Sequence, residues 1–404
     1  MSKFLQSNKK KLFITLGIIA LVILINLIRN SFAQPEIHPL TKSWEKAVPN
    51  QELPQGLASM SAAYCGSCHQ QYYEEWKYST HSHAWTDLQF QAELRKESSP
   101  FLCINCHIPL QNQQELIVDG LIDGDIYQPV TRKNPHFDEQ LQLEGITCAS
   151  CHVRNNAVIA THENTRAPHA VVQDADFLSE KLCISCHNAS AVVTPSLVCT
   201  FETGDEWKAG PYYPEKTCIS CHMETMEREI VPGYGEKQSH YHAFPGSGIP
   251  KLASETTKGL NGMGIYPSPF NSTAAKMDSI IYKLTLINEF AGHNLPTGDP
   301  ERFYNITFTL KNEKDSVLAN QMERIGEEWQ WHPIVEKLSD NNLKPKEERT
   351  YTFSYLPLKE EQLKLSVEIT KHRLNQENAA YNKLPAEYPL FITIFDKEYT
   401  VEVK

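Results

Sequence analysis

Hydrophobic and polar positions divide the chain into stretches of different character. The first is an apolar run at residues 12–28 that follows three lysines at residues 9–11. A helix of this length would span about 25 Å, close to the hydrocarbon thickness of a bilayer. Basic residues followed by an apolar run are typical of an export signal, so we expect residues 1–33 to form a transmembrane signal anchor, or a signal that is cleaved after Ala33. Residues 34–60 would be a linker.

The last part of the chain alternates apolar and polar residues with a period of two. This alternation predicts strands at residues 281–286, 304–310, 351–355, 365–369, 391–395 and 399–403. Several such strands separated by turn residues predict an antiparallel β-sandwich over residues 279–404. A preceding stretch rich in Gly, Ser, Thr, Pro and Asn, residues 251–278, is typical of a connector.

Residues 61–250 lack this alternation and are rich in polar loops. Tyr72, Tyr73 and Trp76 fall at helical spacing and predict one of several short helices. The predicted fold class is therefore mixed. A mostly α-helical and loop domain precedes the antiparallel β-sandwich domain, with one N-terminal transmembrane helix.

Ten of the eleven cysteines lie in five copies of Cys-x-x-Cys-His. The copies are Cys65, Cys68 and His69; Cys103, Cys106 and His107; Cys148, Cys151 and His152; Cys183, Cys186 and His187; and Cys218, Cys221 and His222. At this spacing two thiols can add to the vinyl groups of one porphyrin, and the adjacent imidazole can bind its iron. We therefore expect five covalently bound haem c groups. The alternative is zinc knuckles, against which five identical single units argue.

Cofactor and charge together restrict compartment and partners. Attachment of haem c follows export, so the body is expected on the periplasmic side of the inner membrane, anchored by the N-terminal helix or secreted to the periplasm if the signal is cleaved. The net charge of −11 makes nucleic acid an implausible partner. Redox partner proteins, and the membrane through the N-terminal helix, are the expected contacts.

The sixth coordination position of each iron decides between a closed electron carrier and an open, reactive site. Eleven histidines lie outside the motifs, and those flanked by rigid turn residues or close to a motif are the candidate distal ligands. These candidates are His81, His83, His169, His240, His242 and His293. The alternative for each is a surface or hydrogen-bonded histidine, which is the better interpretation of His136 and His162 and of His38, His332 and His372.

Two other sulfur-containing groups have simple interpretations. Met223 and Met226 follow the fifth motif too closely to reach the opposite face of the same haem, so packing explains them better. Cys199, which no motif uses, is most simply a buried thiol, with a reactive thiol near haem as the alternative.

Several segments resemble the multihaem cytochrome c-554 family. The first motif with Tyr73, Trp76 and His81 resembles the opening of that family. The third motif followed by residues 167–169, and the fifth followed by residues 242–246, continue the similarity. Residues 292–302 resemble a loop of related multihaem proteins. The resemblance implies a stacked chain of haems, electron transfer, and His81, His169, His242 and His293 as distal ligands. It also implies kinship with hydroxylamine oxidoreductase and cytochrome c nitrite reductase. Five motifs instead of four, and the C-terminal domain, depart from the tetrahaem member.

Two functions remain open on these residues. The first is a membrane-tethered carrier that passes electrons along mostly bis-histidine haems between redox partners. The alternative is an oxidoreductase acting on a small nitrogen or sulfur compound, such as nitrite or hydroxylamine, at one five-coordinate haem. Arg154, Arg166 and His162, near the third motif, would then be the first residues to inspect. No acid–base constellation is recognisable, so no catalytic residue is assigned.

Overall fold

The computed structural model describes residues 34–96, 100–162, 166–194, 197–331 and 333–404, and five single residues before them. The predicted signal anchor at residues 1–33 therefore lies almost entirely outside the described residues. A search of the described part of the chain found no helix with the length and apolar character needed to span a bilayer. The transmembrane helix of the predicted fold class thus has no support.

The chain divides into two compact units. The smaller comprises Met1–Leu40 and Val118–Thr131, and its sheet has the order β1-β2-β3. These strands are β1 (Ile37–His38), β2 (Leu116–Ile122) and β3 (Pro129–Lys133). The larger comprises Thr41–Ile117 and Arg132–Lys404, and it contains all five motifs and the C-terminal strands.

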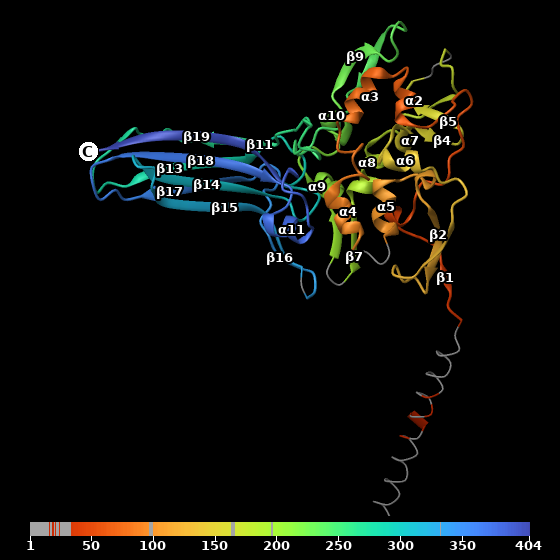
Figure 1. Cartoon of the computed structure of the whole chain (residues 1–404), viewed down its shortest axis with the longest axis horizontal. Helices are drawn as coiled ribbons and strands as arrows, with labels where there is room; N and C mark the ends of the chain where they lie inside the picture. Colours follow the sequence, from red (N-terminus) through yellow and green to blue (C-terminus); the bar gives the residue numbers. More distant parts are fainter. Residues whose placement is uncertain are drawn as a thin grey trace, which may run out of the picture. The chain divides into compact units, whose positions relative to one another are not determined.

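We call residues 61–250 the motif segment. Its helices are short, and most of them carry or adjoin a motif (Figure 1). They are α2 (Ala62–Gly66), α3 (Gln70–Lys77), α4 (Leu88–Leu94), α5 (Phe101–His107), α6 (Glu139–Leu143), α7 (Cys148–His152), α8 (Glu180–His187), α9 (Thr203–Ala209) and α10 (Cys218–His222), with the 3₁₀ turns Ser43–Glu45 and Gln111–Gln113. Side-chain oxygens of Ser61, Asp138 and Thr217 cap three of them at the N-terminus.

The motif segment also contains strands, so the predicted mostly helical and loop domain is wrong. A three-stranded sheet has the order β4-β5-β6, and two hairpins pair β7 with β8 and β9 with β10. The bounds are β4 (Val153–Arg154), β5 (Ala157–Ala160), β6 (Val171–Gln173), β7 (Ala189–Thr194), β8 (Leu197–Phe201), β9 (Thr225–Glu229) and β10 (Glu236–His240). Asn155 and Asn156 form the two-residue loop between β4 and β5. Their φ angles of 51° and 63° are left-handed, which is typical of two-residue hairpin turns.

Two sheets enclose the core of the C-terminal domain (Figure 1). One has the order β11-β13-β17 and the other β12-β19-β18-β14-β15-β16. Because β12 runs parallel to β19, the larger sheet is mixed and not purely antiparallel. The bounds are β11 (Met263–Pro267), β12 (Thr273–Ala274), β13 (Ile280–Asn288), β14 (Phe303–Asn312), β15 (Val317–Gln330), β16 (Glu336–Asp340), β17 (Glu348–Tyr355), β18 (Gln362–His372) and β19 (Phe391–Val403), with α11 (Gln376–Tyr381) after β18.

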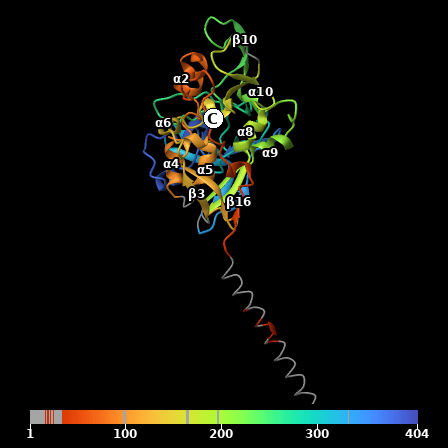
Figure 2. The same cartoon turned by 90° about the vertical axis from the view of Figure 1, so that its right-hand side faces the viewer.

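The core of this domain follows the alternation of the sequence. Along β13, Tyr282, Leu284 and Leu286 are fully buried while the intervening side chains are more exposed. They meet Ile306 and Phe308 of the facing sheet in one hydrophobic cluster. From the side of the motif segment, α4, α5, α8 and α9 lie in front of these sheets (Figure 2). The loop between β13 and β14 carries His293 and reaches α9, where Asn294 and Thr297 bond Glu206.

Candidate haem-binding site

Each Cys-x-x-Cys-His unit lies on or at the end of a short helix. A helical turn brings residues i, i+3 and i+4 to the same face, so both thiols and the imidazole of one unit can meet one porphyrin. Helices α5, α7, α8 and α10 all end at the histidine of their motif. In the first motif the histidine is the N-cap of α3. The backbone thus places the three attachment groups of each unit together before any contact between units is considered.

Backbone carbonyls orient four of the five motif histidines. The Nδ1–H of His107 donates to the carbonyl oxygen of Ala84 at 2.6 Å. His69, His152 and His222 donate in the same way, to Ile230 at 3.1 Å, Ile159 at 2.9 Å and Pro245 at 2.7 Å, respectively. A carbonyl can only accept, so the proton sits on Nδ1 and Nε2 keeps its lone pair for a metal. These residues therefore fit haem iron as proximal ligands.

Four of the five motif histidines each face a second histidine, and the distance between the two rings is nearly the same in all four pairs. The ring centroids are 6.5 Å apart for His69 and His169, 6.3 Å for His187 and His81, 6.2 Å for His152 and His242, and 6.3 Å for His222 and His293. Two metal–nitrogen bonds of about 2 Å, with the distance from each nitrogen to its ring centre, separate centroids by about 6 Å. The four gaps therefore fit one iron each, between two imidazoles.

His107 differs from the other four. Among the described residues, no histidine ring faces it at a comparable distance. Its flank is instead covered by Phe90 of α4, whose ring is stacked on the imidazole with centroids 3.6 Å apart and planes 5° apart. The same segment supplies the Ala84 carbonyl that holds Nδ1. The second motif is thus supported from one side by the start of α4, and it has no histidine partner there.

Two of the six candidate distal histidines have other contacts. His83 places Nε2 2.9 Å from the carboxylate of Glu255. His240 donates through Nδ1 to the carbonyl of Met223 at 2.9 Å. Neither ring faces a motif histidine, whereas His81, His169, His242 and His293 do. Spacing along the sequence could not separate His240 from His242, because the two are only two residues apart; His240 ends strand β10, and His242 lies in the loop that follows.

Burial keeps four of the paired imidazoles neutral, those of His81, His187, His242 and His293. It lowers the pKa of His81 and of His242 to about 3, with the neighbouring imidazoles of His187 and His152 adding to the effect. The pKa of His187 and of His293 is lowered to about 4, again chiefly by burial. A neutral imidazole offers the lone pair that a metal needs, and here it stays neutral throughout the physiological pH range.

Contacts between thiols connect the five units. Cys65 lies within hydrogen-bonding range of Cys148, Cys106 of Cys186, and Cys183 of Cys218. Cys151 lies close enough to Cys183 and Cys186 to interact electrostatically with both. The first unit therefore adjoins the third, the third adjoins the fourth, and the fourth adjoins both the second and the fifth. Cys199, at half-buried β8, interacts with Cys106 of the second unit.

The residues singled out near the third motif do not surround an open position. Arg154 donates through Nη2 to the Ser150 carbonyl at 2.8 Å and lies 5.0 Å from the Phe177 ring centre. Arg166 lies 5.5 Å from the ring centre of Tyr234, and His162 is exposed. The ring facing His152 belongs to His242. The position without a facing histidine is at the second motif instead, which the sequence did not indicate.

Comparisons with known proteins agree with this chemistry. Residues 64–121 match the family described as cytochrome c554 and c-prime. The structure is similar to the crystal structure of a penta-heme cytochrome c552 from Thermochromatium tepidum. The match covers 84% of this chain and 98% of the cytochrome, with 16% sequence identity and a TM-score of 0.60. A CARDB domain from Pyrococcus furiosus covers 35% of this chain and 85% of its own, at 14% identity and a TM-score of 0.18. No curated protein sequence matches.

The family match lies over the first motif, the second motif and the helices between them. The similarity to the pentahaem protein extends over most of the chain and concerns its fold. The predicted resemblance to the cytochrome c-554 family is confirmed, and covalently bound haem c is supported. Residues 64–121 are thus similar to the cytochrome c554 family, and most of the chain shares the fold of a pentahaem cytochrome.

Proposed function

We propose that this protein binds five haem c groups and transfers electrons between redox partner proteins outside the cytoplasm. The observation that carries the proposal is the set of four imidazole pairs, each 6.2 to 6.5 Å between centroids. Two imidazoles per iron leave no coordination position for a substrate, which is typical of electron carriers. Export, which covalent attachment requires, supports the compartment.

The chain's residues would hold the redox groups in fixed positions. When bound, haem iron supplies one-electron chemistry that no side chain provides. Carbonyls behind His69, His152 and His222 prevent these imidazoles from rotating, and the thioethers of each unit would fix the ring edge. Ligands held in both oxidation states need little rearrangement when an electron arrives or leaves.

The contacts between units support a continuous route. Units one, three, four and five form one series, and the second unit branches from the fourth through Cys106 and Cys186. In this arrangement every haem has a neighbour, so electrons entering at one end can reach all five. The donor and acceptor proteins would dock near haem edges at the ends of the series.

The second motif favours a second function, reaction at one open haem. His107 has no facing histidine among the described residues, so its iron would keep one position for a small ligand. A small nitrogen or sulfur compound would bind there and exchange electrons with the fourth unit. This candidate places the reaction at the second motif, away from Arg154, Arg166 and His162.

Electron paramagnetic resonance of the oxidised holoprotein, with mass spectrometry of the same sample, tests both functions. We expect the mass of five haems, four low-spin signals and one high-spin signal. Fewer than five haems would contradict the assignment of the motifs. A high-spin signal that changes with nitrite or hydroxylamine, followed by turnover, would favour the oxidoreductase. An unchanged spectrum without turnover would favour the carrier.

A further inference from the structure

Four cationic side chains gather where the C-terminal domain meets the motif segment. We call Lys251, Arg302, Lys371 and Arg373 the basic cluster. Lys371 and Arg373 are only 8% and 6% exposed, which is rare for charged residues. Arg302 interacts electrostatically with each of the other three. A concentration of like charges at a buried site requires an explanation, because it opposes folding unless anions lie nearby.

Strand register brings three of these cations together. Strands β14 and β18 pair antiparallel, with Phe303 opposite His372 and Tyr304 opposite Lys371. Arg302 precedes β14 directly and Arg373 follows β18 directly, so the two lie at the same end of this strand pair. Like charges on neighbouring strands repel each other. The sheet itself therefore creates the cluster, and its end is directed to the connector that contains Lys251.

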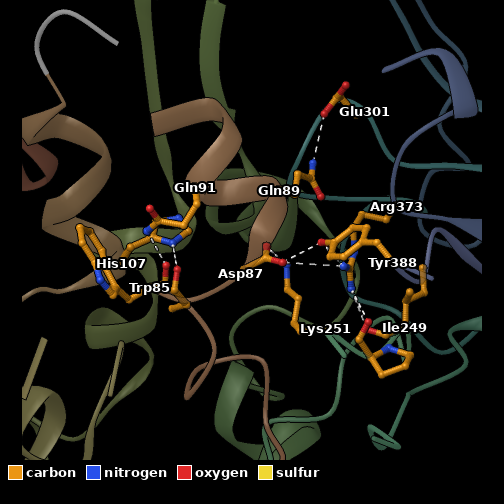
Figure 3. A network of polar contacts seen from close by, with 12 residues as sticks. Trp85, Asp87, Gln89, Gln91, His107, Ile249, Lys251, Glu301, Arg373 and Tyr388 are labelled. Atoms are coloured by element: carbon orange, nitrogen blue, oxygen red, sulfur yellow. Dashed lines mark hydrogen bonds and ion pairs between the residues drawn. The ribbon is translucent and has the colours of Figure 1, made fainter. Parts of the chain in front are cut away.

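One carboxylate neutralises only part of the basic cluster. Asp87 forms an ion pair with Lys251 and lies 4.0 Å from Arg373, and it also accepts a hydrogen bond from Tyr388 at 2.7 Å (Figure 3). Arg373 also donates to the carbonyls of Ile249 and Pro250. Asp87 thus serves two of the four cations, and the remaining two must be considered separately.

Among the described residues, Arg302 and Lys371 donate hydrogen bonds only to neutral oxygens, and neither has an ion pair; Lys371 also lies 5.9 Å from the ring centre of Tyr304. Arg302 donates through Nη1 to the Thr297 carbonyl at 3.0 Å. Lys371 donates to the carbonyls of Ser247 and Leu260 at 3.0 and 3.3 Å. Glu301, next to Arg302, is directed elsewhere, because its carboxylate accepts hydrogen bonds from Gln89 and Asn378. Asp299 interacts electrostatically with Arg302, but it forms no ion pair with it and accepts the backbone N–H of Glu301 instead.

Arg302 is bonded to the loop that carries His293, through the Thr297 carbonyl, and its charge acts on two of the candidate iron ligands. It is the strongest charged neighbour of His187, the motif histidine of the fourth unit, and it also interacts with His293. Each haem c carries two propionates, and planar guanidinium groups bind carboxylates with two parallel hydrogen bonds. The two cations without an ion pair therefore lie where a propionate of the fourth haem would be expected.

We propose that Arg302, supported by Lys371, binds a propionate carboxylate of the haem attached at Cys183, Cys186 and His187, and that the C-terminal domain thereby sets the potential of that haem. This inference rests on the proposed binding of haem at the fourth motif. A positive charge beside the iron opposes oxidation to the ferric state, so it raises the midpoint potential. Arg302 is a positioning residue that acts through the propionate.

Redox titration of the holoprotein, followed by visible and electron paramagnetic resonance spectra, tests this role with three variants. In Arg302→Gln we expect one low-spin haem to shift to a lower midpoint potential while the others stay unchanged. Arg302→Lys keeps the positive charge but loses the planar guanidinium group. The midpoint potential of this haem should therefore stay close to that of wild type. Arg324→Gln is the matched control. Arg324 belongs to the same domain and also donates to a backbone carbonyl, that of Glu327.

Resonance Raman spectra distinguish binding of the propionate from a purely structural role of Arg302, because only binding would affect the propionate bands. The propionate bands of one haem should shift in Arg302→Gln and stay unchanged in Arg324→Gln. Equal potentials and equal bands in these two variants would overturn the proposal. So would a free oxyanion site, in which phosphate or nitrite shifts the wild-type potential but not that of Arg302→Gln. Mass spectrometry of every variant should still give the mass of the chain with five attached haems. A failure of this inference would then be distinguishable from a failure of haem binding, on which the proposed function depends.

Discussion

In the proposed haem sites, the direction of a single histidine side chain would decide whether an iron has a second imidazole. His240 ends strand β10 and His242 lies two residues later, yet His240 donates to the Met223 carbonyl while His242 faces His152. Motif spacing alone identifies the five proximal ligands, because their chemistry requires adjacent residues. The candidate distal ligands come from distant parts of the chain. Turn residues beside a histidine could therefore indicate six candidates but not which of them faces a motif histidine. Nothing in the sequence marks His107 as the ligand without a facing histidine, because that absence depends on all other positions.

Replacing His242 separates the two histidines experimentally. In His242→Ala we expect one low-spin signal to disappear and one high-spin signal to appear, because the iron at His152 would lose its second imidazole. His240→Ala is the matched control, and it should keep all four low-spin signals. The measurement is electron paramagnetic resonance of the oxidised holoprotein. A loss of the same signal in both variants would contradict the assignment of His242.

Glu301 makes stability depend on pH. Burial, with Asp299 and Glu93 nearby, raises its pKa from 4.5 to about 8. Between these values the folded protein holds a proton that the unfolded chain releases, so stability falls as pH rises from about 4.5 to 8. Glu301→Gln should remove this loss. After allowance for solvent screening, the variant should be about 2 kcal/mol more stable than wild type at pH 8 and equal to it near pH 4.5.

Thermal unfolding of both holoproteins at the two pH values measures this effect. The amide of Gln89 can turn to present its oxygen to the new side chain, so the hydrogen bonds need not be lost. A difference between the proteins that is the same at pH 4.5 and pH 8 would contradict the raised pKa of Glu301.

Strands of this protein differ in how clearly the sequence indicates them. Strand β13 alternates buried and exposed residues along its length, and its position was predicted. In strand β15, Val317–Gln330, half of the residues are polar and they do not alternate regularly with apolar ones, so its pairing with β14 could not be read from the pattern. The short strands of the motif segment were missed for another reason. They are two to six residues long and exist because turns place them side by side.

The hairpin of β4 and β5 provides a test of such a turn. Asn156 has φ of 63°, a conformation that β-branched residues strongly disfavour. Asn156→Val should therefore lower the free energy of unfolding by about 2 kcal/mol, while Asn156→Gly should change it by less than about 0.5 kcal/mol. Denaturant unfolding of the holoproteins measures both. Because β5 supplies the Ile159 carbonyl that holds His152, the valine variant should also broaden the signal of that haem. Equal stability of the two variants would contradict the turn.

The proposed haem ligation would also join the two parts of the larger unit. The loop that carries His293 is held on α9 by Glu206, which accepts hydrogen bonds from the backbone N–H of Asn294 at 3.1 Å and the Thr297 hydroxyl at 2.6 Å. The C-terminal domain thus supplies a ligand candidate to the fifth motif through a contact that does not involve haem. Fold comparison alone could not indicate this, because it does not assign side-chain contacts.

Glu206→Ala should loosen this loop. We expect part of the fifth haem to become high-spin as temperature rises, because His293 would leave the iron at His222 more often. Asp205→Ala is the control, since Asp205 is on the same helix but pairs with Lys208 and Asn188 instead. Temperature-dependent visible spectra of the ferric holoproteins measure the effect. Identical spectra of the two variants at all temperatures would contradict this role of Glu206.

The four histidine pairs also interlock along the chain. His81 lies between His69 and its partner His169, and His152 lies between His81 and its partner His187. His222 likewise precedes His242, the partner of His152. As the chain emerges N-terminus first, the first iron must wait for residue 169 and the fifth for residue 293. If the proposed ligation holds, the first haem would lack its second histidine while the second is attached, and the third while the fourth is attached, whereas His81 precedes the fourth motif. The cell would then have to shield the open irons until the later segments emerge.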